Sequence, residues 1–137
     1  MKSSDAVRST MIRFYERLTA SDIERFDPLV SDDPATLVIG TAPGEWVNDR
    51  AGLRFGFETE GVGITASPDS AGFEERPVEW FVDQPTMSYP DGSTIQTRLT
   101  AVLHRAQGAW RLIHMHVSVG VPDDEVVTLQ RRWSPAS

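Results

Sequence analysis

Two long alternating stretches, Thr94–Arg105 and Ala109–Gly120, restrict the fold of this chain more than any other feature. Apolar and polar residues alternate along both, which is typical of strands with one buried and one exposed face. The loop between them, Ala106-Gln107-Gly108, ends in glycine, which is typical of a three-residue hairpin loop with a bulge. The sequence therefore predicts a long antiparallel hairpin whose apolar face must be covered by other elements.

The loop length decides which residues face one another across this hairpin. A three-residue loop pairs Arg105 with Ala109 and His104 with Trp110. The predicted inner face is mostly apolar and holds Ile95, Thr97, Leu99, Ala101 and Leu103 with Arg111, Ile113, Met115, Val117 and Val119. The predicted outer face is mixed and holds Gln96, Arg98, Thr100, Val102 and His104 with Trp110, Leu112, His114, His116 and Ser118. A slip by one residue would bring Arg98 and His104 onto the apolar face, so we prefer the bulged turn.

Helical spacing dominates the first part of the chain. Residues 4–19 carry an apolar stripe at the i, i+3, i+4, i+7 spacing of a helix, formed by Val7, Met11, Phe14, Tyr15 and Leu18. Ser21 and Glu24 have the spacing of a capping box and predict a second helix that begins at Ser21. A third helix is predicted over residues 49–60, capped by Asn48, with Leu53 and Phe57 on its buried side.

The rest of the chain is predicted to be mainly strand. Thr36–Gly40 is rich in β-branched residues and predicts a short strand. Phe73–Asp83 predicts one long strand that continues beyond a bend at Pro85 to the turn signal Tyr89–Ser93. A short helix is predicted over Asp123–Trp133, with acids first and arginines last. No repeat or linker divides the chain, so one domain is predicted over residues 1–137, with 123–137 as a helical tail.

Composition argues against several classes of function. The net charge is −7 and Lys2 is the only lysine, so the basic surface that nucleic acids require is not expected. There are no cysteines, which removes thiol nucleophiles, disulfides and cysteine zinc sites. No apolar run approaches the ~18 residues of a membrane span, and the first residues lack a signal-peptide core. We therefore expect a cytoplasmic protein, without a membrane partner and without a cofactor.

The stretch TAVLHRAQGAWRLIHMHVSVGVP, residues 100–122, resembles the closing hairpin of the SnoaL-like branch of the nuclear transport factor 2-like superfamily. It is also similar to the closing hairpin of the calcium/calmodulin-dependent kinase association domain. The resemblance implies a single SnoaL-like domain of the α+β class. In that cone-shaped, cystatin-like fold, N-terminal helices pack on a curved, mainly antiparallel sheet. It further implies a pocket between the helices and the concave face, and a homodimer formed through the convex face.

This sequence differs from two functional patterns of that superfamily. Phe14 stands where steroid isomerases place a tyrosine, and the strand TLVIG lacks their aspartate base. Ala101 and Val117 stand where the association domain has arginines that line its pocket. Steroid isomerisation by that machinery and an anionic ligand held by arginines are therefore disfavoured.

Large apolar residues are distributed over the elements that would surround such a pocket. The residues expected to line it are Phe14, Tyr15, Trp46, Phe57, Leu99 and Met115. Their character implies an apolar small molecule as the ligand.

The histidines suggest a partner surface more than a metal site. His114 and His116 are two residues apart on a strand and share a face. A zinc site needs a third ligand, and His104 lies on the order of 13 Å away along the strand. We therefore predict no metal site and expect Trp110, His114 and His116 at the homodimer interface.

Asp83 is the predicted catalytic base. It follows Trp80 and Phe81 in an apolar strand, where loss of water would raise the pKa of a carboxyl group. Its face depends on the turn near Gly92: a bulged turn places Asp83 beside Leu99 on the apolar face, and a two-residue turn does not.

Two hypotheses follow from the sequence. In the first, the protein is an acid/base enzyme of the cyclase, isomerase, dehydratase or hydrolase type that acts on an apolar small molecule. In the second, it is a non-catalytic module for ligand binding or dimerisation. The sequence does not decide between them.

Overall fold

A computed structural model describes residues 1–53 and 61–134. The helical elements are α1 (Asp5–Thr19), α2 (Ile23–Phe26), the 3-10 turn η1 (Asp27–Leu29) and α4 (Asp123–Trp133). The strands are β1 (Lys2–Ser3), β2 (Leu37–Ile39), β3 (Trp46–Val47), β4 (Gly63–Thr65), β5 (Ala71–Glu75), β6 (Val78–Asp83), β7 (Thr86–Ser88), β8 (Thr94–Ala106) and β9 (Ala109–Val119).

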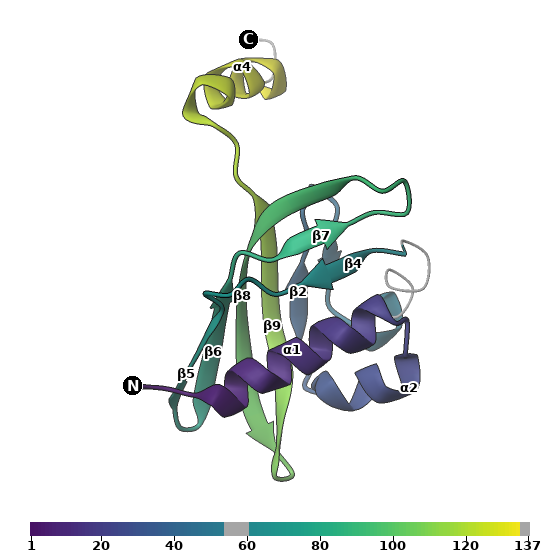
Figure 1. Ribbon diagram of the computed structural model, residues 1–137, viewed down its shortest axis with the longest axis vertical. Coiled ribbons are helices and arrows are strands. Elements are labelled where there is room, and N and C mark those ends of the chain that lie inside the picture. The colour runs from purple at the N-terminus through teal and green to yellow at the C-terminus, as the bar shows by residue number, and fades with distance from the viewer. Residues whose placement is uncertain (54–60, 135–137) are drawn as a thin grey trace.

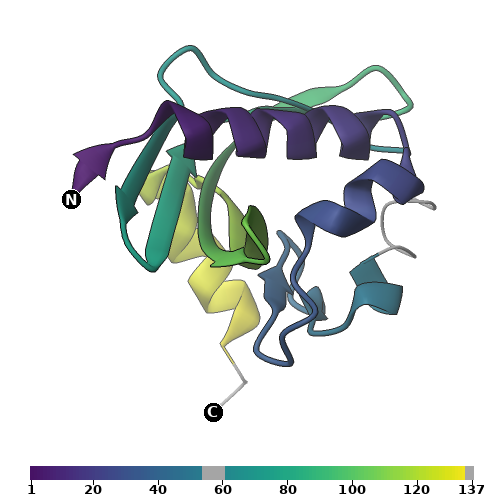
Figure 2. The ribbon, with the colours of Figure 1, turned by 90° about the horizontal axis from the view of Figure 1, so that it is seen from below.

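The helices at the start of the chain pack on one face of a mixed, mainly antiparallel sheet, which confirms the predicted α+β class. The strand order is β1-β5-β6-β8-β9-β2-β3, and β7 extends the edge of β8 and pairs with β4. β2 runs parallel to β9, and the other neighbours are antiparallel. Figures 1 and 2 show α1 lying across the sheet with α2 folded back near its end.

Helix α1 forms where the apolar stripe predicted it. Ser4 caps it by accepting a hydrogen bond from the Val7 backbone N–H at 3.4 Å. The buried residues of the helix include all five members of the stripe. Gly72 of β5 allows the close approach of α1, because a Cβ there would lie 2.7 Å from the Arg8 nitrogen and 2.8 Å from the Ser4 oxygen.

The predicted caps of the next two helices are wrong by one residue. Asp22, not Ser21, caps α2 by accepting from the Arg25 N–H at 3.3 Å, and Ser21 has a positive φ of 51°. Residues 50–53 are helical, and Asp49 rather than Asn48 caps them by accepting from the Gly52 N–H at 2.6 Å. The rest of the predicted third helix, with Phe57, lies outside the described residues.

The predicted long strand over Phe73–Asp83 is in fact a hairpin. Strand β5 ends before Arg76 and Pro77, and β6 returns antiparallel to it with Phe73 opposite Trp80. Pro77 has no N–H for a strand ladder and a fixed φ, so it favours a turn within an otherwise β-rich sequence. Tyr89–Ser93 does form the predicted turn, with Gly92 at a φ of 85°.

The register of the closing hairpin differs from the prediction at two places. Gln107 and Gly108 form a two-residue turn, both with positive φ, so Ala106 rather than Arg105 pairs with Ala109. A bulge at Ile113 then changes the pairing, because Leu103 faces Leu112 but Val102 faces His114.

The bulge exchanges the two faces of β9 near the turn. Leu112 is 1% exposed and belongs to the core, whereas Ile113 is only half-buried, the reverse of the predicted assignment. Trp110 lies opposite Arg105 and packs against the inner core, not on the outer face with His114. Beyond the bulge, Met115 and Val117 lie on the inner face as predicted.

Helix α4 has the predicted bounds and stands apart from the body of the fold. None of its residues is buried, and Trp133 is 71% exposed. Figure 1 shows it projecting beyond the end of β9. Among the described residues, no helix combines the length and apolar character needed to span a bilayer.

Candidate functional site

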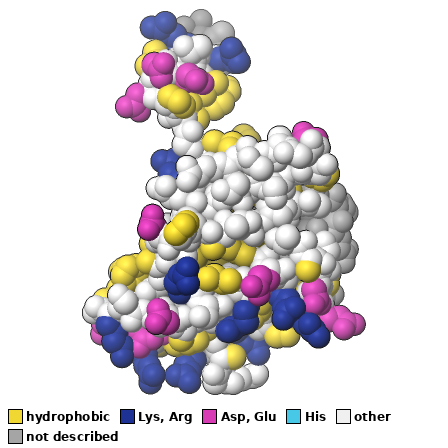
Figure 3. Space-filling model, in the orientation of Figure 1, with side chains coloured by type: hydrophobic (Ala, Val, Ile, Leu, Met, Phe, Trp, Pro, Cys, Tyr) yellow, Lys and Arg dark blue, Asp and Glu magenta, His cyan; other side chains and the backbone are white. Residues whose placement is uncertain are grey.

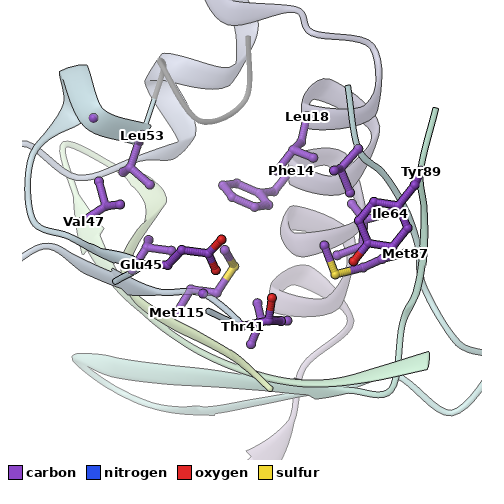
Figure 4. Close-up of a pocket in the computed structure, with 15 residues that line it drawn as sticks. Phe14, Leu18, Thr41, Glu45, Val47, Leu53, Ile64, Met87, Tyr89 and Met115 are labelled. Atoms are coloured by element: carbon purple, nitrogen blue, oxygen red, sulfur yellow. The ribbon is translucent and has the colours of Figure 1, made fainter. Parts of the chain in front are cut away.

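An apolar cavity of about 430 Å³ lies between α1 and the inner face of the sheet. Phe14 and Leu18 of α1 form one wall, and Val38 of β2 and Met115 of β9 form the opposite one. Met87 of β7 and further aliphatic residues also belong to the lining (Figure 4). A cavity of this size and character suits a small ligand that is largely apolar.

Among the described residues, three polar side chains line this cavity: Thr41, Glu45 and Tyr89. Figure 4 shows the Glu45 carboxylate directed into the space between Phe14 and Met115. Its Oε2 atom accepts a hydrogen bond from the Ala42 N–H at 2.8 Å. Within the described part of the chain, Oε1 makes no hydrogen bond, so one carboxylate oxygen is available to a ligand.

Gly40 makes room for this carboxylate. A Cβ at Gly40 would occupy the position of the Glu45 carboxylate and would lie 2.9 Å from the Glu45 Cβ. The two residues also pair through their backbones, since the Gly40 N–H donates to the Glu45 carbonyl at 2.9 Å. The segment between β2 and β3 therefore holds an acidic side chain against a glycine and directs it inward.

Sequence reasoning missed Glu45. The segment TAPGEW contains turn-forming residues, and nothing in its local pattern shows which way the glutamate points. The available signal was the presence of Gly40 and Gly44 shortly before one acid between two short strands. These glycines predict an inward-pointing glutamate only weakly, unless β2 is already known to lie next to β9.

Asp83 lies on the inner face beside Leu99, as the bulged turn predicted. Asp83 is 7% exposed, and both of its carboxylate oxygens accept hydrogen bonds. Tyr15 donates its hydroxyl to Oδ2 at 3.2 Å, and Ser67 donates to Oδ1 from its hydroxyl at 2.5 Å and its N–H at 3.2 Å. The Gln84 N–H donates to Oδ1 at 2.8 Å. Asp83 thus joins α1, the loop before β5 and the end of β6.

Tyr15 is held in its neutral form by this environment. Burial raises the pKa of the Tyr15 hydroxyl far above its ordinary value, and the charge of Asp83 and their hydrogen bond raise it further. Tyr15 therefore acts as a hydrogen-bond donor to Asp83. It packs edge-on against Phe81 at 6.1 Å between ring centroids and does not line the apolar cavity.

The other residues predicted to line the pocket, and the predicted base Asp83, lie in three different places. Phe14 and Met115 line the apolar cavity. Leu99 and Asp83 instead border a more polar depression of about 680 Å³, which also includes Arg98 and His116 of the outer face. Trp46 is 64% exposed and lines neither space.

A second buried carboxyl group belongs to Glu79, which lies opposite Glu74 in the β5–β6 hairpin. Glu79 of β6 is fully buried, and its pKa is raised to about 7, first by burial and then by the facing Glu74. Glu74 has a lowered pKa because the Ser4 hydroxyl and Lys2 bond to it, at 2.8 and 3.1 Å. As a carboxylate, Glu79 has no hydrogen-bond partner among the described groups, so the protonated form is favoured.

The outer face of the sheet carries an exposed apolar row. Val78, Trp80 and Val82 alternate along β6 and are 46%, 40% and 38% exposed. Phe73 of β5 lies against Trp80, with ring centroids 5.7 Å apart. Across the same face, His114 is half-buried and His116 is exposed.

The opposite surface carries charges of both signs. Figure 3 shows Lys and Arg side chains interspersed with Asp and Glu side chains over α1 and α2. His104 contacts a distant part of the chain, since its Nε2 atom lies 2.7 Å from the Ser31 hydroxyl. Among the described residues, no group of three or more His, Asp or Glu side chains is placed to hold a metal ion.

Comparisons with known proteins agree with this architecture. A family model described as the SnoaL-like domain matches residues 7–122. No curated protein matches the sequence.

Solved structures share the fold at low sequence identity. A nuclear transport factor 2-like protein of unknown function from Pseudomonas putida has a TM-score of 0.73 and 15% identity, over 90% of this chain and 94% of that one. An uncharacterized protein with a cystatin-like fold from Caulobacter vibrioides has a TM-score of 0.70 and 18% identity, over 93% and 96%. The CamKII hub homology domain of Chlamydamonas reinhardtii has a TM-score of 0.68 and 17% identity, over 86% and 99%.

Proposed function

The chain belongs to the SnoaL-like domain family, and on that premise we propose that it binds a largely apolar small molecule in the cavity between α1 and the sheet. The observation that carries this proposal is the cavity of about 430 Å³, lined mainly by aliphatic and aromatic side chains. Burial of a ligand's apolar surface contributes roughly 25 cal/mol for each Å² removed from water. Such a cavity is thus a favourable site for an apolar ligand.

Binding can be tested with a neutral fluorescent dye such as Nile red. Val47→Trp places a bulky side chain in the cavity wall and is expected to reduce dye binding at least tenfold. Val121→Trp is the matched control, because Val121 is 38% exposed and lies outside the cavity lining. Equal dye binding by the parent protein and both variants would contradict the proposed site.

Acid/base catalysis on the bound molecule is the second candidate function. Glu45 supports it, because its carboxylate faces the cavity, has one oxygen without a hydrogen bond to the described residues, and can accept a proton from a ligand. Asp83 remains a prediction as catalytic base, but its four accepted hydrogen bonds favour a role in holding the fold. With an identified substrate, Glu45→Gln should abolish turnover and Asp83→Asn should retain part of it.

We also propose a homodimer formed through the outer face of the sheet. The row of Val78, Trp80 and Val82 on β6 supports this, since adjacent exposed apolar residues are typical of an interaction surface. The structural similarity to a hub homology domain is consistent with self-association. Light scattering at micromolar concentration should give twice the chain mass, and Trp80→Glu should give the monomer mass. A monomeric parent protein would contradict the dimer.

A further inference from the structure

We propose that the cavity selects an apolar amine, whose ammonium group pairs with the Glu45 carboxylate. This inference rests on the proposed function, because it names the chemical class of the ligand for the same cavity. The position of Glu45, the charges of the lining and the size of the cavity support this ligand class.

The position of Glu45 is fixed by its neighbours. Oε2 is held by the Ala42 N–H at 2.8 Å, and the Glu45 backbone is tied to Ala42 at 3.0 Å and to Gly40 at 2.9 Å. The side chain passes over Gly40, where any Cβ would displace it. The carboxylate is therefore set in place before a ligand arrives, and a preorganised group binds with a smaller loss of conformational freedom.

The charges of the lining favour a cation. Glu45 is the only Asp, Glu, Lys, Arg or His among the described residues that line the cavity. Its side chain is half-buried, and the surrounding lining is mostly apolar, so its charge is less screened there than in bulk water. The net charge of −7 on the whole chain also attracts cations and repels anions.

The size and polarity of the cavity define the rest of the ligand. A volume of about 430 Å³ lies in the lower part of the range of roughly 300–1,000 Å³ that is typical of small-molecule sites. It suits a skeleton of one or two rings. The ammonium group would meet Glu45, and the hydroxyls of Thr41 and Tyr89 are further polar groups in the lining.

A set of isosteric probes tests this inference by calorimetry at pH 7. Naphthylmethylamine, naphthylmethanol and naphthoate share one ring system and carry a cationic, a neutral and an anionic group. A hydrogen bond to a charged group contributes roughly a tenfold to hundredfold gain in affinity. We expect the amine to bind at least tenfold more tightly than the alcohol, and naphthoate to bind most weakly.

Glu45→Gln identifies the residue responsible. Glutamine keeps an acceptor oxygen and loses the charge, so the variant should lose most of the preference for the amine and much less of the affinity for the alcohol. Glu16→Gln, an exposed change on α1, is the matched control and should retain the preference. Raising the salt concentration should weaken amine binding more than alcohol binding.

The outcomes separate the two proposals. Equal affinities for amine and alcohol, tighter binding of naphthoate, or an amine preference that survives Glu45→Gln would overturn the inference and leave the apolar cavity as a binding site. If none of the three probes binds, and Nile red does not bind either, the proposed function itself fails.

Discussion

Glu79 shows how a single residue can make the stability of this fold depend on pH. Its pKa is about 7 in the folded protein, against an ordinary value of 4.5, because it is buried beside Glu74. Arg105 and Arg76 oppose the shift but do not cancel it. The folded state therefore holds the Glu79 proton more tightly than the unfolded state does. The contribution of Glu79 to the free energy of unfolding therefore falls as pH rises from 4.5 to 7. Above pH 7 the unfavourable contribution of Glu79 stays constant.

We expect Glu79→Gln to stabilise the protein at pH 8 and to change its stability little at pH 4.5. The shift corresponds to roughly 3 kcal/mol at pH 8, because one pKa unit is about 1.4 kcal/mol. Glutamine has nearly the same shape and cannot ionise. Urea unfolding of the parent and the variant at both values measures the difference. An equal difference at both pH values would contradict this account, and Glu16→Gln serves as the exposed control.

Asp83 and Asp91 allow a matched comparison of one hydrogen-bond pattern in two settings. Each accepts from the N–H and the hydroxyl of a serine, Ser67 for Asp83 and Ser93 for Asp91. Asp83 is buried and also holds Tyr15, whereas Asp91 lies in an exposed turn.

Asp83→Ala should therefore cost several times more stability than Asp91→Ala. Loss of Asp83 leaves buried donors on Tyr15 and Ser67 without an acceptor, at about 2–4 kcal/mol in total. Loss of Asp91 leaves donors that water can reach, at less than about 1 kcal/mol. Chemical unfolding at neutral pH measures both. Similar costs would show that Asp83 does not hold the fold together.

At the scale of elements, the bulge in β9 decides which side chains reach the core. We expect Leu112→Ala to cost about 2–5 kcal/mol, because Leu112 is 1% exposed within the core. Ile113→Ala should cost clearly less, since Ile113 is half-buried. The register predicted from sequence requires the reverse order. Unfolding measurements on the two variants distinguish the registers, and a larger cost for Ile113 would contradict the bulge.

Regular elements could be predicted from the sequence because their signals are local. The stripe of α1 and the acids and arginines of α4 lie within single helices, and both helices form where predicted. The hairpin partners of β8 were also predictable, since alternation and turn residues lie close together in the chain. The position of Asp83 beside Leu99 follows from a bulged turn at Gly92, one of the two turns that the sequence allows there.

The remaining features depend on contacts between distant segments. The bulge at Ile113 accompanies the burial of Leu112 in the core and its pairing with Val30, which no local pattern shows. Trp46 was predicted to line the pocket because it is large and apolar, but β3 is an edge strand and Trp46 points to solvent. Glu45 enters the cavity only because β2 lies beside β9 and Gly40 leaves room for it.

At the scale of the whole molecule, α4 is expected to be separable from the body of the fold. The family match ends at Pro122, and α4 begins at Asp123 without a buried residue. A chain that ends at Pro122 is therefore expected to keep its free energy of unfolding within ~0.5 kcal/mol, the usual range for changes at the surface. Urea unfolding of the shortened and the full chain checks this. A loss of several kcal/mol would show that α4 contributes to the core.

The projecting helix also affects how the molecule moves through water. A body with an arm experiences more friction than a sphere of the same 15.2 kDa, so it diffuses more slowly and leaves a sizing column earlier. Judged by elution volume alone, a single chain would be assigned too large a mass and would resemble a compact dimer. Removal of residues 123–137 should therefore delay elution by more than the lost mass predicts, even if the oligomeric state does not change.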